Sequence, residues 1–440
     1  MQLPLPNTEP RLQRRYEQLV REHCGPAHAT AAGLRAVPAE QVTAFASTQA
    51  AWRYYHNPRL DLVQLMAPLL TAARQSASEA CDRFCLVVHD WSFLDYATHT
   101  TKRDRIRITL GKGDALGYDL RTALLVSDRT GAPLAPLCHD LRAADGVHSS
   151  RAAAVQRPDS RLDELAAVFD FVDAQGLARP AVHLIDREAD SVGHYRQWHH
   201  AGHFFIVRAD HDRLVRYDGQ ERSLPSVVRC LQRRGVFQEV REVTFRGRRA
   251  RQFVAEATVT LERPARQHRV VQGVKKHKIV PGPPLTLRLV VSQVRDGRGR
   301  LLVEWLLFTN LPTNIAAAEV ALWYYWRWQV ESFFKLLKGA GHELEHWQQD
   351  SAAALARRLL IASMACVLVW QLARNPAPEA AQLRSLLVRL SGRQMAWGVA
   401  FTEPALLAGL WVLLAMLAVL QQHSVDELRA LAALILPDTS

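Results

Sequence analysis

The sequence predicts an α/β protein in which a β-rich insertion interrupts the central part of the chain and helices occupy both ends. From Cys85 onward, apolar runs of strand length (CLVV, LRTALLV, AVHLI and HFFIV) alternate with a helical stretch between Leu162 and Val172. Before residue 80 and after Pro312, apolar residues recur at the helical period instead. We therefore expect helical ends around a mixed core.

Length and composition limit the classes of protein to which the chain can belong. Its 440 residues are 48% hydrophobic and 22% charged, which excludes a disordered or collagen-like chain and predicts more than one structural unit. The net charge of +12 favours a polyanionic partner, nucleic acid or an anionic membrane surface. Arginine provides most of this charge, however, and a GC-rich genome produces that imbalance without a functional cause.

No segment is predicted to cross or enter a membrane. The longest apolar run, residues 405–420, is shorter than the roughly 18 to 20 residues that span a bilayer, so we expect a buried bundle helix. The six cysteines form no CxxC pair, and the amino terminus has no signal-peptide pattern. These features predict reduced thiols and a cytoplasmic protein, associated with the bacterial nucleoid if it binds DNA.

The first 80 residues are expected to form a helical, basic DNA-binding region. An apolar stripe lies between arginines in the first predicted helix and is made by Leu12, Tyr16, Leu19 and Val20.

Residues 241–300 hold most of the excess charge. They contain 15 Lys and Arg against four acids, a net charge of +11. Alternating apolar residues and the turn clusters PGPP and DGRG predict that 211–300 form a β-rich insertion with exposed basic loops. The alternative is a solvated basic edge that prevents strand aggregation.

The segment WYYWRWQVESFFKLLKG, residues 323–339, is the most informative. At about 100° per residue, a helix would place one polar set within an arc of about 60°, with the apolar residues on the far side. The polar set is Tyr324, Arg327, Glu331 and Lys338. An ordinary amphipathic helix gives the same division, so periodicity alone does not assign a function.

The spacing of this set, Tyr-x2-Arg-x3-Glu-x6-Lys, resembles the signature of the insertion-sequence-four family of DDE transposases. The segment DREAD at 186–190 is similar to the family's second catalytic segment, and CLVVHDWSFLDY to its first. AAWRYYHNPR resembles part of the family's amino-terminal DNA-binding region, and the resemblance extends from about residue 45 to about 370. It implies an RNase H-like catalytic domain formed by 81–210 and 301–350, with a dimerisation region at 351–440.

The resemblance also implies an active site. Asp90, Asp186 and Glu331 are expected to be the catalytic acids and the ligands of two Mg²⁺ or Mn²⁺ ions, because phosphodiester cleavage by two metals uses hard oxygen ligands. Asp95 stays open as an alternative to Asp90, and Asp190 is a weaker candidate than Asp186.

Other residues are expected to contact DNA. Arg327, Lys338 and Tyr324 suit phosphate binding. Trp305 aligns with a family tryptophan that stacks on a flipped base, although a tryptophan in an apolar strand is more often part of a core. The remaining expected DNA-binding residues are Arg53, Arg59, Arg208, Arg248, Arg249, Lys275 and Lys276.

The implied activity is cut-and-paste DNA transposition. A homodimer would bind double-stranded transposon ends, nick them, form and resolve a hairpin, and transfer the ends into target DNA. Two alternatives remain: a catalytically inactive DNA-binding descendant, and a metal-dependent nuclease that cuts without strand transfer.

Overall fold

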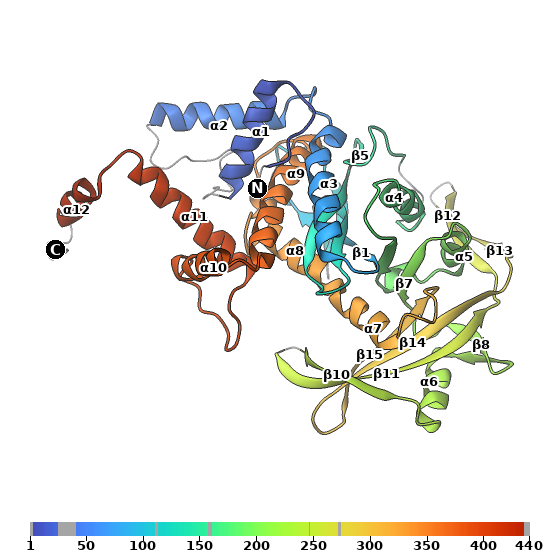
Figure 1. Ribbon diagram of the computed structural model, residues 1–440. Helices are drawn as coiled ribbons and strands as arrows, with labels where there is room; N and C mark the ends of the chain where they lie inside the picture. The colour runs from blue at the N-terminus through green and yellow to red at the C-terminus, as the bar shows by residue number, and fades with distance from the viewer. Residues whose placement is uncertain are drawn as a thin grey trace.

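The computed structural model describes residues 3–24, 41–110, 113–156, 161–245, 247–271 and 274–434. It is a mixed α/β protein in which helices cover both faces of one large sheet (Figure 1). The predicted α/β class is therefore confirmed.

The large sheet contains 13 strands, and its first half surrounds β1. β1 pairs antiparallel with β3, and β3 pairs antiparallel with β4 and β2, while β5 forms the edge beyond β4. On its other side β1 is parallel to β6, and β6 is parallel to β7. These strands are β1 (Cys85–Asp95), β2 (Ile106–Leu110), β3 (Gly113–Ser127), β4 (Pro133–Ala143), β5 (Gly146–Ser149), β6 (Ala181–Ile185) and β7 (Phe204–Arg208).

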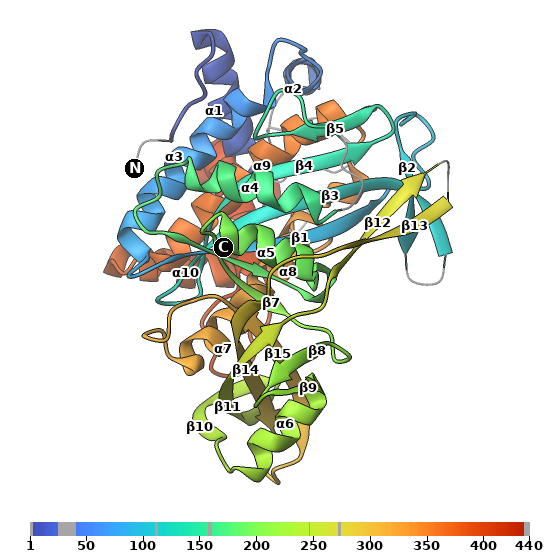
Figure 2. The same ribbon diagram turned by 90° about the vertical axis from the view of Figure 1, so that its right-hand side faces the viewer.

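The second half of the sheet comes mainly from residues 211–300. β15 pairs with β7, and the order continues through β14, β11, β8 and β9, with β10 beside β11. These strands are β8 (Leu214–Tyr217), β9 (Gln220–Ser223), β10 (Gln238–Phe245), β11 (Arg248–Leu261), β14 (Leu285–Arg295) and β15 (Leu301–Thr309). They thus extend the central sheet, while β12 (Ala265–Val271) and β13 (Val274–Val280) form a separate two-stranded ribbon (Figure 2).

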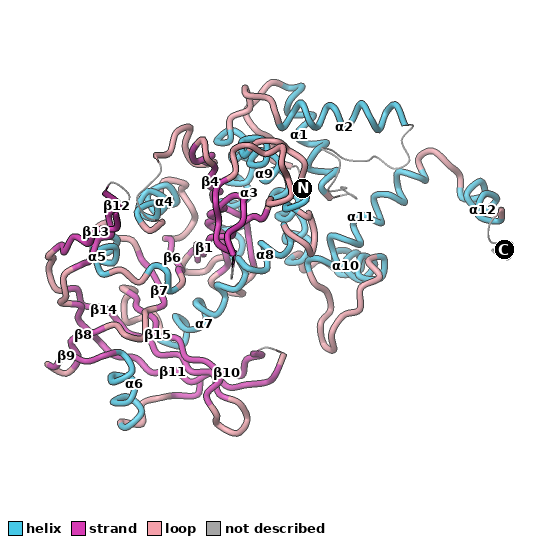
Figure 3. Tube along the Cα trace, turned by 180° about the vertical axis from the view of Figure 1, so that it is seen from behind, coloured by secondary structure: helices cyan, strands magenta, loops and turns pink. Residues whose placement is uncertain are grey.

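Two hydrophobic cores lie on opposite faces of the sheet. One face is covered by α4 (Asp163–Asp173), α5 (Val192–His200) and α6 (Leu224–Arg233). The other is covered by α3 (Leu62–Ala80), α7 (Ala317–Tyr325), α8 (Gln329–Leu337) and α9 (Ala352–Arg374), with α1 (Pro10–His23) and α2 (Gln41–Tyr55) packed outside (Figure 3). The apolar stripe predicted for the first helix is confirmed, because Tyr16, Leu19 and Val20 are buried against α9 and its neighbours.

The carboxy-terminal helices are α10 (Pro378–Leu390), α11 (Glu403–Leu420) and α12 (Val425–Ala433). Both α9 and α11 are long and apolar enough to cross a membrane by length and composition alone, but α9 is 83% buried in the protein and α11 only 22%. The prediction that 405–420 is a buried helix is therefore wrong for most of its length. Its first turns pack on α10, where Gly409 approaches the carbonyl of Leu387, and the rest projects from the body (Figure 1).

Candidate functional site

Three acids reach one region from three separate elements. Asp90 lies in β1, Asp186 directly follows β6, and Glu331 lies in the first turn of α8. Because β1 and β6 are parallel neighbours, their side chains near the carboxyl ends are close in space, and α8 packs against β1. The fold therefore brings the predicted acids together.

Arg327 connects two of these acids. Its Nη1 donates to Oδ2 of Asp90 at 3.2 Å, and its Nη2 donates to Oε1 of Glu331 at 3.1 Å. Asp186 lies close enough to act electrostatically on both Asp90 and Arg327. The site therefore consists of three carboxylates around one guanidinium.

Burial is the main influence on Asp90. It raises the pKa of this carboxyl from 3.8 to about 6, and the nearby charges of Asp186 and Glu331 act in the same direction. Two contacts lower the pKa of Asp90 without cancelling the rise. One is the positive charge of Arg327, and the other is a hydrogen bond from the backbone N–H of Trp91 to Oδ1 of Asp90 at 2.9 Å. A cation bound beside Asp90 would stabilise the ionised form of this buried carboxyl group.

These acids are a suitable donor set for divalent metal ions. Carboxylate oxygens are the ligands that Mg²⁺ and Mn²⁺ prefer. The carboxylate oxygens of Asp90, Asp186 and Glu331 do not all lie within 4.8 Å of one another. The three acids are therefore spaced too widely to converge on a single ion without a rearrangement of their side chains.

Tyr324 and Arg208 border the acids. Burial raises the pKa of the Tyr324 phenol to about 12, while the positive charges of Arg327 and Arg208 lower it and Asp186 raises it. Arg208 ends β7, the strand beside β6, which explains its position next to Asp186. Two of the expected phosphate-binding groups thus lie beside the acids.

The polar set does not lie on one continuous helix, and that prediction is wrong. A 3₁₀ segment, η2 (Trp326–Trp328), separates α7 from α8, and Arg327 is its central residue. Lys338 leaves the helical conformation, with φ −87° and ψ −134°. Its ammonium donates to the Phe93 carbonyl at 2.7 Å and pairs with Glu345 at 3.0 Å. These two contacts leave one of the three ammonium donors of Lys338 for a phosphate.

The alternative acids occupy other surroundings. Asp95 is exposed and accepts from the backbone N–H of Ala97 at 2.9 Å. Asp190 accepts from the hydroxyl of Tyr195 at 2.9 Å and pairs with Arg213 at 2.9 Å. The geometry therefore places Asp90 and Asp186, but neither alternative, in the carboxylate group with Glu331.

Trp305 lies in the core, with 4% of its surface exposed. Its ring meets Tyr324 edge-on at 5.9 Å between centroids and Tyr325 at 6.2 Å. Stacking on a flipped base requires the indole to leave this packing, so that role stays a prediction.

The predicted basic residues differ in exposure. Arg53 is exposed within α2 and Arg59 just after it, and Arg248 and Arg249 are exposed at the β10–β11 hairpin. The side chains of Lys275, Lys276 and Lys278, and residue Arg246 as a whole, lie outside the described residues. Acids compensate part of the excess charge through ion pairs, three of which are Arg251–Glu239, Arg263–Glu221 and Arg288–Glu256.

Sequence reasoning missed a histidine cluster on the opposite face of the sheet. His89 and His183 lie inside the apolar strands that lead to Asp90 and Asp186, and both are buried. The available signal was one histidine within each of two buried apolar runs, CLVVHD and AVHLID.

Comparison with known proteins gives little guidance. No family model matches the chain, and no curated protein matches it. Among solved structures, a cryo-EM structure of a piggyBac transposase synaptic complex with hairpin DNA is similar, with 9% sequence identity and a TM-score of 0.39. That similarity covers 93% of this chain and 72% of the other, and at this TM-score it establishes neither a shared fold nor a shared activity.

Proposed function

We propose that the chain is a metal-dependent DNA transposase of the DDE class, with the insertion-sequence-four family as its nearest type. One observation carries the proposal: Asp90, Asp186 and Glu331, distant in sequence, lie around Arg327, where the paired stretch of β1 and β6 ends and α8 begins. The strand order β4-β3-β1-β6-β7, with antiparallel pairs before β1 and parallel pairs after it, is the order expected of an RNase H-like domain.

The acids would hold two Mg²⁺ or Mn²⁺ ions, with Asp90 shared and Asp186 and Glu331 each completing one site. When bound, the ions supply activation of the attacking water or 3′-hydroxyl and stabilisation of the leaving oxygen. Arg327 would exchange its carboxylate partners for the scissile phosphate, which a guanidinium can bind through two hydrogen bonds. Tyr324 would donate one further hydrogen bond to that phosphate.

The DNA partners would be transposon ends and target duplex in the bacterial cytoplasm. The exposed Arg53, Arg59, Arg248 and Arg249 support phosphate contacts away from the acids. A homodimer joined through residues 351–440, in which each protomer cuts the end held by the other, would complete the synaptic complex. The half-exposed apolar side chains of α11 support a contact there.

A strand-transfer assay tests the proposal. Purified protein, Mg²⁺, labelled DNA ends taken from the inverted repeats beside the gene, and a supercoiled target plasmid are incubated together. The proposal predicts labelled ends joined to the plasmid, with hairpin ends as intermediates. Cleavage without joining would indicate a nuclease, and binding without cleavage would indicate an inactive DNA-binding descendant.

A further inference from the structure

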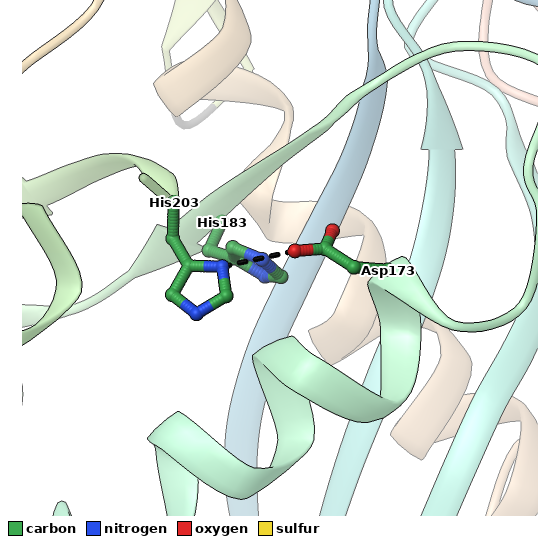
Figure 4. A group of neighbouring side chains, drawn as sticks. All are labelled: Asp173, His183 and His203. Atoms are coloured by element: carbon green, nitrogen blue, oxygen red, sulfur yellow. Dashed lines mark hydrogen bonds and ion pairs between the residues drawn. The ribbon is translucent and has the colours of Figure 1, made fainter. Parts of the chain in front are cut away.

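A second group of metal-binding side chains lies on the sheet face opposite the acids. It contains Asp173 at the end of α4, His183 in β6 and His203 just before β7 (Figure 4). One ring nitrogen from each histidine and one oxygen of Asp173 all lie within 4.8 Å of one another. Three elements therefore direct ligand atoms at one point.

His203 is already held by two carboxylates of α4. Its Nδ1 lies 3.0 Å from Oδ2 of Asp173, and its Nε2 lies 3.2 Å from Oδ1 of Asp170. These contacts raise the pKa of His203. Both carboxylates are exposed, so this edge of the cluster borders solvent.

His183 supplies the observation that points to a ligand. Its side chain is fully buried, with its ring stacked on Phe169 at 3.6 Å between centroids. Its Nδ1 is 2.9 Å from Nε2 of His89, whereas its own Nε2 has no hydrogen-bond partner within the part of the chain that the structure describes. A buried polar nitrogen without a partner is costly unless another group satisfies it.

The arrangement of His183 is that of a metal ligand. A ligating histidine commonly uses one ring nitrogen for the metal and the other for a hydrogen bond that fixes the ring. Here His89 provides the fixing contact. Burial and the neighbouring histidines lower the pKa of His183, which keeps its imidazole neutral and its lone pair available.

We propose that Nε2 of His183, Nδ1 of His203 and the Asp173 carboxylate bind one Zn²⁺ ion, with water as the fourth ligand, while Nε2 of His203 keeps its contact with Asp170. Two imidazoles with a carboxylate suit Zn²⁺ better than Mg²⁺, which prefers oxygen ligands alone. The ion would join α4 to β6 and to the start of β7.

This site is separate from the proposed catalytic metals but linked to them through the backbone. His89 directly precedes Asp90, and His183 lies three residues before Asp186. Zinc would therefore fix β6, which leads to Asp186, directly, and β1, which carries Asp90, through the contact between His89 and His183. The competing explanation is that His203 only forms ion pairs with α4.

Zinc binding is measured directly, without a cleavage readout. Full-length protein is freed of metal with a chelator and then titrated with Zn²⁺ in excess Mg²⁺, which occupies oxygen-only sites. Bound zinc is counted by mass spectrometry, and Co²⁺ replaces Zn²⁺ for absorption spectra that report imidazole ligation. We expect one Zn²⁺ per chain and a higher melting temperature with zinc.

Three variants separate the explanations. Asp173→Asn, at an exposed position, should weaken zinc binding by at least about tenfold, and His203→Gln should abolish it. His194→Gln is the matched control, because His194 of α5 also pairs with an aspartate of α4, Asp163, at 3.0 Å and lies outside the cluster. This control should bind zinc normally.

Asp186→Asn should also keep its zinc, which distinguishes this site from the carboxylate site even if the proposed function is wrong. No bound zinc in the wild-type protein would overturn the inference, and so would zinc binding that Asp173→Asn leaves unchanged. If His203→Gln does not fold, the result with Asp173→Asn decides.

Discussion

Neutralising Asp90 should stabilise the protein while it removes activity. Burial and the neighbouring acids raise the pKa of this carboxyl from 3.8 to about 6, and its side chain is only 18% exposed. The folded state therefore binds the Asp90 proton more tightly than the unfolded state does. The free energy of unfolding should fall as the pH rises from about 4 to above 6.

The size of the effect follows from the pKa. A rise from 3.8 to about 6 corresponds to a penalty of about 3 kcal/mol at pH 8. Asp90→Asn keeps the shape and removes the charge, but its amide loses part of the Arg327 interaction. We expect a net gain of about 1 to 3 kcal/mol at pH 8, seen as a rise of a few degrees in melting temperature.

Thermal melts at pH 8 and pH 5, with and without Mg²⁺, measure this effect. The higher melting temperature of Asp90→Asn should be present at pH 8 without metal. The difference from wild type should become smaller at pH 5, where wild-type Asp90 is mostly protonated. Mg²⁺ should stabilise the wild-type protein more than the variant, because the variant lacks a ligand. Asp95→Asn, at an exposed carboxylate, is the control and should change little. An Asp90→Asn variant less stable than wild type at pH 8 would refute the reasoning.

Two other substitutions test neighbouring features. Trp305→Ala should destabilise the protein by about 3 to 5 kcal/mol, because the side chain is buried against Tyr324, and denaturant unfolding measures this loss. Only a variant with wild-type stability and a selective loss of hairpin formation would favour base stacking. Replacing both Arg248 and Arg249 with Ala should reduce the slope of log K against log salt for DNA binding by about 1.8, since each phosphate contact contributes about 0.9. Arg251→Ala should change the slope less, because Arg251 already pairs with Glu239 at 3.0 Å. Equal slopes in all these proteins would mean that the hairpin faces solvent.

Local patterns were sufficient to predict the elements that position the acids. The runs CLVV, AVHLI and HFFIV became β1, β6 and β7, because long apolar runs between polar segments suit strands buried on both faces. The helical period between Leu162 and Val172 became α4, Asp163–Asp173. Asp186 directly follows β6, as its apolar run predicts, whereas Asp90 was expected to follow its strand and instead lies in the middle of β1, because that strand continues to Asp95.

The turn within the Tyr-Arg-Glu-Lys segment could not be predicted in the same way. A fixed rotation of 100° per residue contains no information on where backbone hydrogen bonds change from the α to the 3₁₀ pattern at 326–328. Lys338 departs from the helix where Phe93, distant in sequence, and Glu345, seven residues further on, offer oxygen partners. Tertiary contacts therefore determine both features.

Exposure and pairing also depend on distant residues. The apolar composition of α11 predicted a buried helix. Burial also requires neighbouring elements, however, and after the first turns of α11 no described element covers it fully. The net charge of 241–300 follows from the sequence, but Arg251 and Arg263 form ion pairs with glutamates outside that range, which the count does not include. The histidine cluster formed because β6 brings His183 beside β1, a pairing that no local pattern reveals.

Mg²⁺-dependent cleavage of labelled transposon-end DNA, resolved on gels beside a mobility-shift assay, tests the central claim most directly. Separate Ala substitutions at Asp90, Asp186 and Glu331 should each abolish cleavage and leave end binding intact, because the basic surfaces are unchanged. The losses should not add in double variants, since one missing ligand already disrupts the shared site. Asp95→Ala should cut nearly as well as wild type. Wild-type cleavage by Glu331→Ala, or cleavage lost in Asp95→Ala but kept in Asp90→Ala, would contradict the assigned site.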